Sequence, residues 1–197
     1  MSFLKLCRSQ PAKFVQTSMS RAKVRAAGEE RPWTMIFDCD EIVEGRLWIG
    51  SYIDAESVRS LRPLGITAVL SLQSDRDLEE YNIQWAKLLN AYELAGIQIH
   101  RVPIPDFDRQ ALSANLSRGV AELETALNLP GSKVYVHCTA GINRGPAVAA
   151  AYLIKTRGLS AREAYDYVTA RRSCNPYLDC LEAYEASFKS GQARQTS

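Results

Sequence analysis

The chain has 197 residues, and its 24 Lys and Arg against 22 Asp and Glu give a formal net charge of +2. Hydrophobic residues make up 46%, which is an ordinary globular fraction and excludes disorder throughout, a collagen-like repeat and a disulfide scaffold. The apolar runs are far shorter than the ~20 residues that a membrane-spanning helix needs, so the sequence does not predict an integral membrane protein.

The charge is distributed unevenly along the chain. Residues 1–28 hold six basic side chains and no acidic one, whereas residues 29–197 hold 18 basic and 22 acidic side chains. The excess of acidic side chains in residues 29–197 argues against nucleic acid as the main partner. The basic segment, with its serines and small residues, resembles an organelle transit peptide, and an ordinary basic tail is the alternative. We therefore expect a basic segment at 1–32, one folded domain at 33–190 and a short C-terminal tail at 191–197.

The cysteines and histidines are too few, and wrongly spaced, for a disulfide framework or a zinc site. The five cysteines are odd in number and include no CxxC pair, which favours a reducing compartment. Only His100 and His137 could add imidazole ligands, so we expect no metal site.

The predicted elements alternate between strands and helices. Four segments rich in β-branched and aromatic residues predict buried strands at 47–49, 66–72, 97–102 and 134–136. Before the fourth strand, leucine and valine at helical spacing over 116–127 predict a helix that ends at Pro130-Gly131. Three helices follow the fourth strand: one from Pro146 to Gly158, one opened by a Ser160–Glu163 capping box, and a short amphipathic one with Leu181, Tyr184 and Phe188. This order predicts an α/β fold with a central, mostly parallel sheet flanked by helices and a helical C-terminal part.

The segment from Val136 to Pro146, Val-His-Cys-Thr-Ala-Gly-Ile-Asn-Arg-Gly-Pro, joins the last predicted strand to a predicted helix. Arg144 supplies a planar fork that can hold two oxygens of a tetrahedral anion. The helix N-terminus adds positive charge, and Gly141 permits the turn of the loop. Backbone N–H groups can complete such an anion nest, those of Thr139, Ala140, Gly141, Ile142, Asn143 and Arg144. The same positive field favours the thiolate form of Cys138, which would be a nucleophile aimed at bound phosphorus.

This arrangement predicts displacement at phosphorus through a phosphocysteine that water then hydrolyses. Asp106 is the candidate general acid, because it follows the third predicted strand and its loop can reach the same edge of the sheet. Asp108 is the fallback, and a loop-capping role is the alternative for Asp106. We expect no metal or organic cofactor for this chemistry.

The pattern His137-Cys138-x5-Arg144 resembles the signature of the cysteine-dependent protein tyrosine phosphatase superfamily. The spacing of Asp106 and Cys138 is similar to that of the dual-specificity branch. A rhodanese, or a phosphatase of the cell-division-cycle type, can show the same Cys-x5-Arg-Gly-Pro pattern. Gly141 and the upstream aspartate favour the dual-specificity interpretation.

Within that branch, four segments resemble the plant and algal glucan phosphatases, which dephosphorylate starch or other phosphorylated glucans: residues 72–79, 106–108, 138–141 and 172–179. The resemblance implies that Tyr81, Trp85 and Phe107 contact the glucan, with core packing as the alternative for Trp85. The basic, acid-free N-terminus indicates a plastid location, because a plastid-type transit segment joins it to a glucan substrate; a cytoplasmic location is the alternative. A protein phosphatase acting on phosphoserine, phosphothreonine or phosphotyrosine, and a module that binds glucan or phosphoprotein without turnover, remain alternative functions.

Three positions depart from this resemblance, and a fourth is shared with it. Asn143 replaces a glycine and predicts a narrower, more polar mouth, while Asn175 replaces an aromatic residue and removes one stacking platform. Ser71 replaces a cysteine that could pair with Cys138 under oxidation. Gly145, shared with the glucan phosphatases, stands where many other members carry a hydroxyl that helps the thiolate leave, so we expect slow phosphocysteine breakdown.

Overall fold

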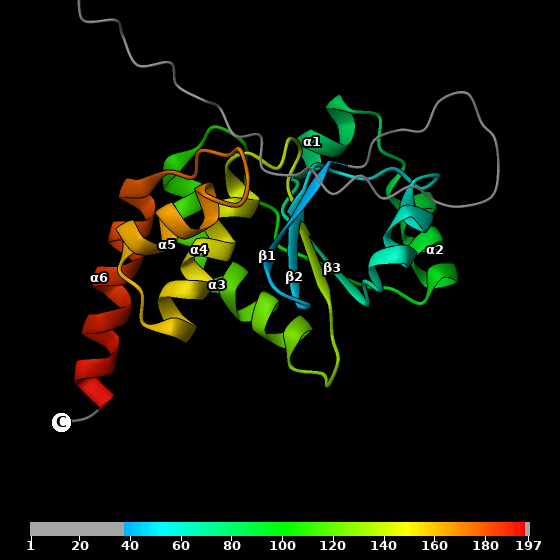
Figure 1. Ribbon diagram of the computed structural model, residues 1–197. Helices are drawn as coiled ribbons and strands as arrows, with labels where there is room; N and C mark the ends of the chain where they lie inside the picture. The colour runs from blue at the N-terminus through cyan, green and yellow to red at the C-terminus, as the bar shows by residue number, and fades with distance from the viewer. Residues whose placement is uncertain (1–37, 196–197) are drawn as a thin grey trace, which may run out of the picture.

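The structure is a computed structural model that describes residues 38–195, so the predicted basic segment at 1–32 lies outside the described residues. A five-stranded sheet runs through the middle of the molecule in the order β1-β2-β5-β3-β4 (Figure 1). The β1–β2 pair is antiparallel and the other neighbouring pairs are parallel. The strand bounds are Cys39–Val43 (β1), Leu47–Gly50 (β2), Ala68–Ser71 (β3), Gln98–Arg101 (β4) and Val134–His137 (β5).

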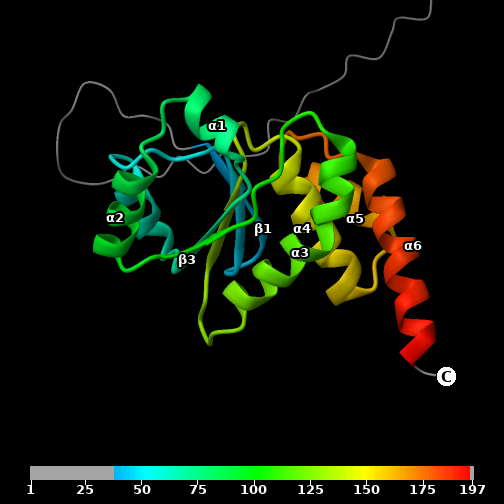
Figure 2. The same ribbon diagram turned by 180° about the vertical axis from the view of Figure 1, so that it is seen from behind.

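Helices cover both faces of the sheet, which makes three layers (Figures 1 and 2). One face is covered by a 3-10 helix η1 (Val58–Leu64) and by α2 (Trp85–Ala95). The other face carries α3 (Arg109–Leu127), α4 (Arg144–Arg157), α5 (Ala161–Thr169) and α6 (Leu178–Gln195). The short helix α1 (Asp75–Glu80) follows β3 at the carboxyl edge of the sheet.

The pleat of the strands divides the core into two clusters, because successive side chains point to opposite faces. In β5, Val134 and Val136 pack with helices α3 to α6, whereas Tyr135 packs with η1 and α2. All three side chains are buried, so the central strand is apolar on both faces, as expected for a parallel strand covered on both sides. The strand thus holds the residues that follow it, from Cys138 onward, at a fixed place.

The predicted fold class is confirmed, and the four predicted strands and the capping box of α5 are present. Strand β1 was not predicted, because its five residues include Asp40 and Glu41 and form no β-rich run. It lies at the edge of the sheet, where one face and one backbone edge need no apolar cover. Helix α6 is longer than the short helix predicted and continues to Gln195.

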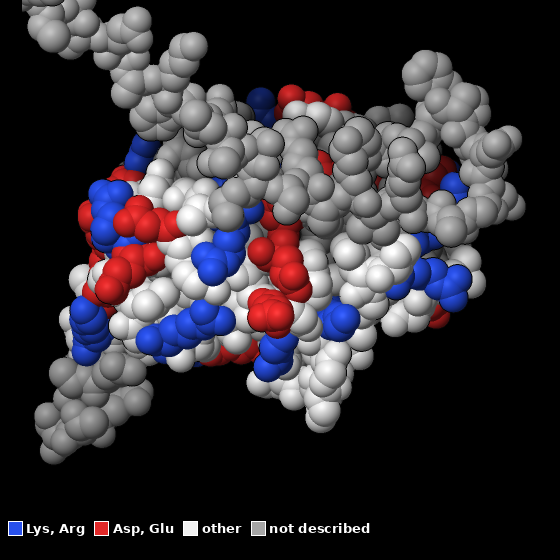
Figure 3. All heavy atoms as spheres, viewed as in Figure 1, with Lys and Arg blue, Asp and Glu red and all other residues white. Residues whose placement is uncertain are grey.

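The surface charge, the length of the helices and the grouping of possible metal ligands bear on what the protein can bind. Acidic and basic side chains are interspersed on the face seen in Figure 3, without a broad patch of one sign. Within residues 38–195, no helix is long and apolar enough to cross a membrane, and no group of three or more His, Cys, Asp or Glu side chains is placed to hold a metal ion.

Candidate active site

The catalytic loop, residues 138–143, connects the central strand β5 to the start of α4. Cys138 is buried, with 2% of its surface exposed. Gly141 has φ +67°, and a Cβ atom there would lie 2.3 Å from the carbonyl oxygen of Gly50 at the end of β2. Only glycine avoids both the left-handed strain and this clash, so the position expected to permit the turn is also packed against the neighbouring strand.

Arg144 is the largest fully buried side chain of the described residues, and its guanidinium is held by protein groups on several sides. Its Nη1 donates to Asp77 Oδ2 at 2.7 Å and to the Ile104 carbonyl at 2.8 Å. Its Nη2 donates to Asp77 Oδ1 at 3.2 Å and to Thr139 Oγ1 at 3.1 Å, and it forms an ion pair with Asp106 Oδ2 at 2.8 Å. Its Nε has no partner among the described residues. This N–H is therefore free to donate to an anion.

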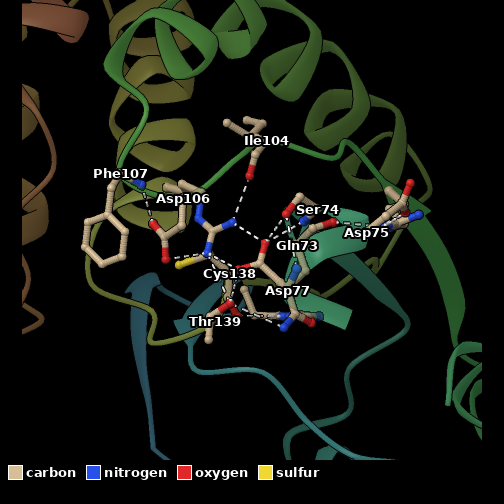
Figure 4. Close-up of polar contacts among 12 residues, drawn as sticks. Gln73, Ser74, Asp75, Asp77, Ile104, Asp106, Phe107, Cys138 and Thr139 are labelled. Carbon is tan, nitrogen blue, oxygen red and sulfur yellow. Dashed lines mark hydrogen bonds and ion pairs between the residues drawn. The ribbon is translucent and has the colours of Figure 1, made fainter. Parts of the chain in front are cut away.

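Asp106 lies in the loop after β4 and points into the site, as expected for the candidate acid. In Figure 4 its carboxylate and the sulfur of Cys138 point toward one another. Its Oδ1 accepts a hydrogen bond from the Phe107 backbone N–H at 3.0 Å, and Oδ2 pairs with Arg144. Asp108, the fallback, instead caps α3 by accepting from the Ala111 N–H at 2.8 Å. The two aspartates therefore have separate roles, and the one beside Cys138 is Asp106.

Phe107 is held in an unusual conformation beside the acid. Its φ is +58°, in the left-handed region that costs a non-glycine residue about 1–2 kcal/mol. Its ring is 88% exposed, so burial does not repay that cost. A strained, exposed aromatic residue next to the candidate acid indicates a binding role.

The three aromatic residues expected to contact substrate separate into two groups. Tyr81 is 46% exposed at the end of α1, and its ring lies 5.5 Å from that of Tyr52. Tyr52 is next to the catalytic loop, because its N–H donates to the Thr139 carbonyl at 3.0 Å. Trp85 is half-buried, packs against the cluster under α2 and lies beneath the guanidinium of Arg101 at 4.9 Å. Core packing, the alternative for Trp85, accounts for its contacts.

Burial and charge shape the ionisation of the site. Burial lowers the pKa of His137 to about 4, so this histidine is neutral at neutral pH, and its Nδ1 contacts the Cys138 carbonyl at 3.1 Å. Burial by itself would raise the pKa of Asp77, but hydrogen bonds from Arg144 and Ser74 lower it to about 2. Burial opposes the charge of Arg144 as well, yet Asp77, Cys138 and Asp106 raise its pKa above the usual value. The site therefore keeps Arg144 charged and His137 neutral.

A second buried arginine supports the catalytic loop from the segment between α5 and α6. Arg172 Nε donates to the Gly141 carbonyl at 2.7 Å, and its Nη atoms pair with Asp40 at 2.7 Å and Asp38 at 3.0 Å. Next to it, two of the positions that depart from the family pattern contact each other: Asn143 Nδ2 donates to the Asn175 carbonyl at 3.0 Å. The loop is thus tied to this segment through both residues.

Three residues at the site were missed in the sequence. Asp77 had a detectable signal, since Ser74 and Asp77 form a capping-box pattern at the start of α1. Tyr52 follows the carboxyl end of β2, where ligands of open α/β sheets bind, but no pattern singled it out. Nothing in the sequence marks Arg172 as a partner of Gly141, because 31 residues separate the two along the chain.

Comparison with known proteins decides the family. Residues 47–185 match the model of the dual specificity phosphatase catalytic domain. The chain belongs to the dual specificity phosphatase family. It is a cysteine-dependent phosphatase, and the rhodanese alternative is removed, because the matched region includes the catalytic loop and its upstream aspartate.

This dual specificity phosphatase has relatives of two kinds. Phosphoglucan phosphatase DSP4, amyloplastic, of Castanea sativa is 35% identical over 152 residues, which are 74% of this chain and 39% of that protein. The chain therefore spans less than half the length of that relative. Human dual specificity protein phosphatase 26 is 28% identical over 91% of this chain and 92% of its own length. The crystal structure of PTPMT1 shares the fold, with a TM-score of 0.64 at 22% identity over 79% of this chain and 99% of that one.

Proposed function

We propose that this phosphatase removes phosphate monoesters from phosphorylated glucans, with Cys138 as nucleophile, Arg144 as phosphate clamp and Asp106 as general acid. The observation that carries the glucan assignment is the set of aromatic rings around the catalytic loop: the exposed Tyr81, which pairs with the half-buried Tyr52, and the exposed Phe107 beside the acid. A sugar ring presents an apolar C–H face that stacks on such rings.

In the proposed reaction, the Cys138 thiolate attacks phosphorus in line with the leaving oxygen. The S–P bond forms as the P–O bond to the sugar breaks, and Asp106 gives its proton to the departing oxygen. A water then attacks the phosphocysteine, the ionised Asp106 takes a proton from it, and inorganic phosphate and the thiolate are released. Backbone N–H groups of residues 139–144 and the Arg144 fork hold the three non-reacting oxygens in both steps.

Two features support glucan over phosphoprotein. Phe107 keeps its ring in solvent in spite of an unfavourable backbone conformation, which is explained if a ligand covers the ring. The chestnut relative named a phosphoglucan phosphatase has 35% identity to this chain, compared with 28% for the human protein phosphatase. The proposed plastid location follows from the same relative, whose name places it in the amyloplast.

A dual-specificity protein phosphatase is the second candidate. It is favoured by the match to human dual specificity protein phosphatase 26, which extends over nine tenths of both chains. Residue Ile142 of the catalytic loop is 49% exposed and could contact a peptide as well as a sugar.

Phosphate release from solubilised phosphoglucan and from a phosphoserine peptide, at equal phosphate ester concentration, separates the two candidates. We expect faster release from the glucan, and a selective loss in Phe107→Ala. Leu94→Ala is the matched control, because Leu94 is also exposed (81%) but lies on α2 away from the loop. Faster release from the peptide, or equal losses in both variants, contradicts the glucan assignment.

In Cys138→Ser we expect no turnover but retained co-sedimentation with glucan, and turnover near that of the wild type would contradict the mechanism. A fluorescent fusion with and without residues 1–32 tests the plastid location.

A further inference from the structure

Asp77 connects helix α1 to the catalytic loop through both of its carboxylate oxygens. Oδ2 accepts from the backbone N–H of Ser74 at 2.7 Å, from the Ser74 hydroxyl at 2.6 Å and from Arg144 Nη1 at 2.7 Å. Oδ1 accepts from the Thr139 hydroxyl at 3.0 Å and from Arg144 Nη2 at 3.2 Å. The side chain is 7% exposed, and that of Arg144 is 2% exposed, so the pair is a buried, bidentate ion pair.

The contacts of Arg144 show which side of the guanidinium is available. The Asp77 carboxylate accepts hydrogen bonds from the edge of the guanidinium formed by Nη1 and Nη2, and the Ile104 carbonyl accepts the other hydrogen bond of Nη1. The remaining edge consists of Nε and the second hydrogen of Nη2. On that edge Nε has no partner among the described residues, and the carboxylate that Nη2 meets there is the partly exposed one of Asp106; Nη2 also donates to the Thr139 hydroxyl at 3.1 Å. An anion with two oxygens fits this edge, because both hydrogens lie on one side of a planar group.

We propose that Asp77 is a positioning residue of the reaction: by occupying the Nη1–Nη2 edge, it holds Arg144 so that the Nε–Nη2 edge receives the phosphate. The inference rests on the proposed function, in which Arg144 clamps the phosphate. We place Asp77 behind Arg144 and not against substrate, because its side chain is only 7% exposed and both of its carboxylate oxygens accept hydrogen bonds from protein groups.

A purely structural role makes a different prediction. Asp77 is also the third residue of α1 and completes the capping box with Ser74, so its loss removes a helix cap in any case. A cap alone would affect folding stability and leave the response to changes at Arg144 unaltered. A positioning role couples the two side chains, because without Asp77 the guanidinium loses its bidentate partner and Asp106 becomes its one carboxylate partner.

A double-mutant cycle on a small aryl phosphate measures this coupling, with Asp77→Asn, Arg144→Lys and the double variant. Arg144→Lys alone should lower kcat/KM on the order of a hundredfold, because lysine cannot form the fork. Asp77→Asn alone should lower kcat/KM tenfold or more and raise the inhibition constant of inorganic phosphate. In the Asp77→Asn background, Arg144→Lys should cost only about threefold more, since the fork is already misplaced.

Two controls separate positioning from capping and from charge. Asp75→Asn removes the same charge from the same helix, where Asp75 contacts Arg101 and not Arg144, and should leave kcat/KM and phosphate inhibition unchanged. Ser74→Ala removes the cap hydroxyl but keeps the Asp77 carboxylate, so it should lower the melting temperature and leave phosphate inhibition near the wild-type value. Should Asp77→Asn not fold, Asp77→Glu replaces it in the same cycle.

The outcomes are distinct. Equal costs of Arg144→Lys in both backgrounds overturn the positioning role of Asp77. A harmless Arg144→Lys in the wild-type background instead overturns the phosphate clamp of the proposed function. Because the assay uses an aryl phosphate, a failure of the glucan assignment affects neither result.

Discussion

In the proposed reaction, Asp106 and the substrate phosphate compete for the same Nη2 hydrogen of Arg144. In the structure the Asp106 carboxylate is 2.8 Å from Nη2, beside the unpartnered Nε. A phosphate that binds both atoms must first displace this carboxylate. The substitution Asp106→Asn keeps the size of the side chain but removes its charge, so we expect tighter binding of inorganic phosphate together with the loss of acid catalysis.

The size of the effect follows from the ion pair. The Asp106 side chain is 30% exposed, so solvent weakens its pairing with Arg144. A charge-assisted hydrogen bond in this setting contributes about 1–2 kcal/mol, which corresponds to a fall of about 5- to 30-fold in the inhibition constant of inorganic phosphate. The loss of the proton donor should lower kcat on phosphoglucan by about 10²–10⁴.

Competitive inhibition by inorganic phosphate, measured with an aryl phosphate at neutral pH, tests the prediction. Asp108→Asn is the matched control, because it removes the same charge two residues away from a carboxylate that caps α3. That variant should keep its stability, because asparagine caps a helix about as well as aspartate, and phosphate inhibition should not change. If Asp106→Asn binds phosphate no more tightly than the wild type, the two groups do not compete for Arg144.

Three other predictions concern the surroundings of the loop. Because burial lowers the pKa of His137 to about 4, the unfolded chain takes up a proton near pH 6.5 before the folded one does, and the free energy of unfolding should fall by about 3 kcal/mol between pH 7 and 4. Urea unfolding at several pH values measures this, and an equal slope in His137→Asn would assign the fall to other groups. Phe107→Gly relieves the positive φ, so it should leave the melting temperature equal or higher while phosphoglucan turnover drops; a lower melting temperature argues against strain. A Cβ on Gly145 would meet its nearest atom at 3.6 Å, an ordinary contact, so Gly145→Ser should fold and should abolish the burst of aryl alcohol that we expect from the wild type; a wild type without a burst contradicts slow phosphocysteine breakdown.

The fold was largely predictable because its strands are buried on both faces. Val134 to Val136 is apolar throughout and lies at the centre of the sheet, and this is the pattern that hydrophobicity detects best. Strand β1 escaped prediction for the opposite reason: it is an edge strand that contains Asp40 and Glu41, and Asp40 contacts Arg172, which lies 132 residues later in the chain. Only the folded chain brings these two residues together.

The site was predictable where its chemistry is local. Cys138 and Gly141 lie in one loop and Arg144 begins the helix that follows it, so the residue types needed for anion capture lie close together in the sequence. The partners of Arg144 are not local, since Asp77 and Ile104 lie 67 and 40 positions away. No periodicity or spacing links residues that distant, so the orientation of the guanidinium could not be inferred.

The sequence by itself determined the fold class, the family and the loop on which the reaction takes place. These depend on contiguous residues and on apolar patterns, both of which can be read directly from the amino-acid sequence. The tertiary structure decided that Asp77 and Asp106 both contact Arg144, and that Trp85 packs against the protein while Tyr52 lies at the loop. The physical reason is that the carboxyl ends of β2, β3, β4 and β5 meet at one edge of the sheet, where the order of the strands, and not the order of the residues, sets which side chains touch.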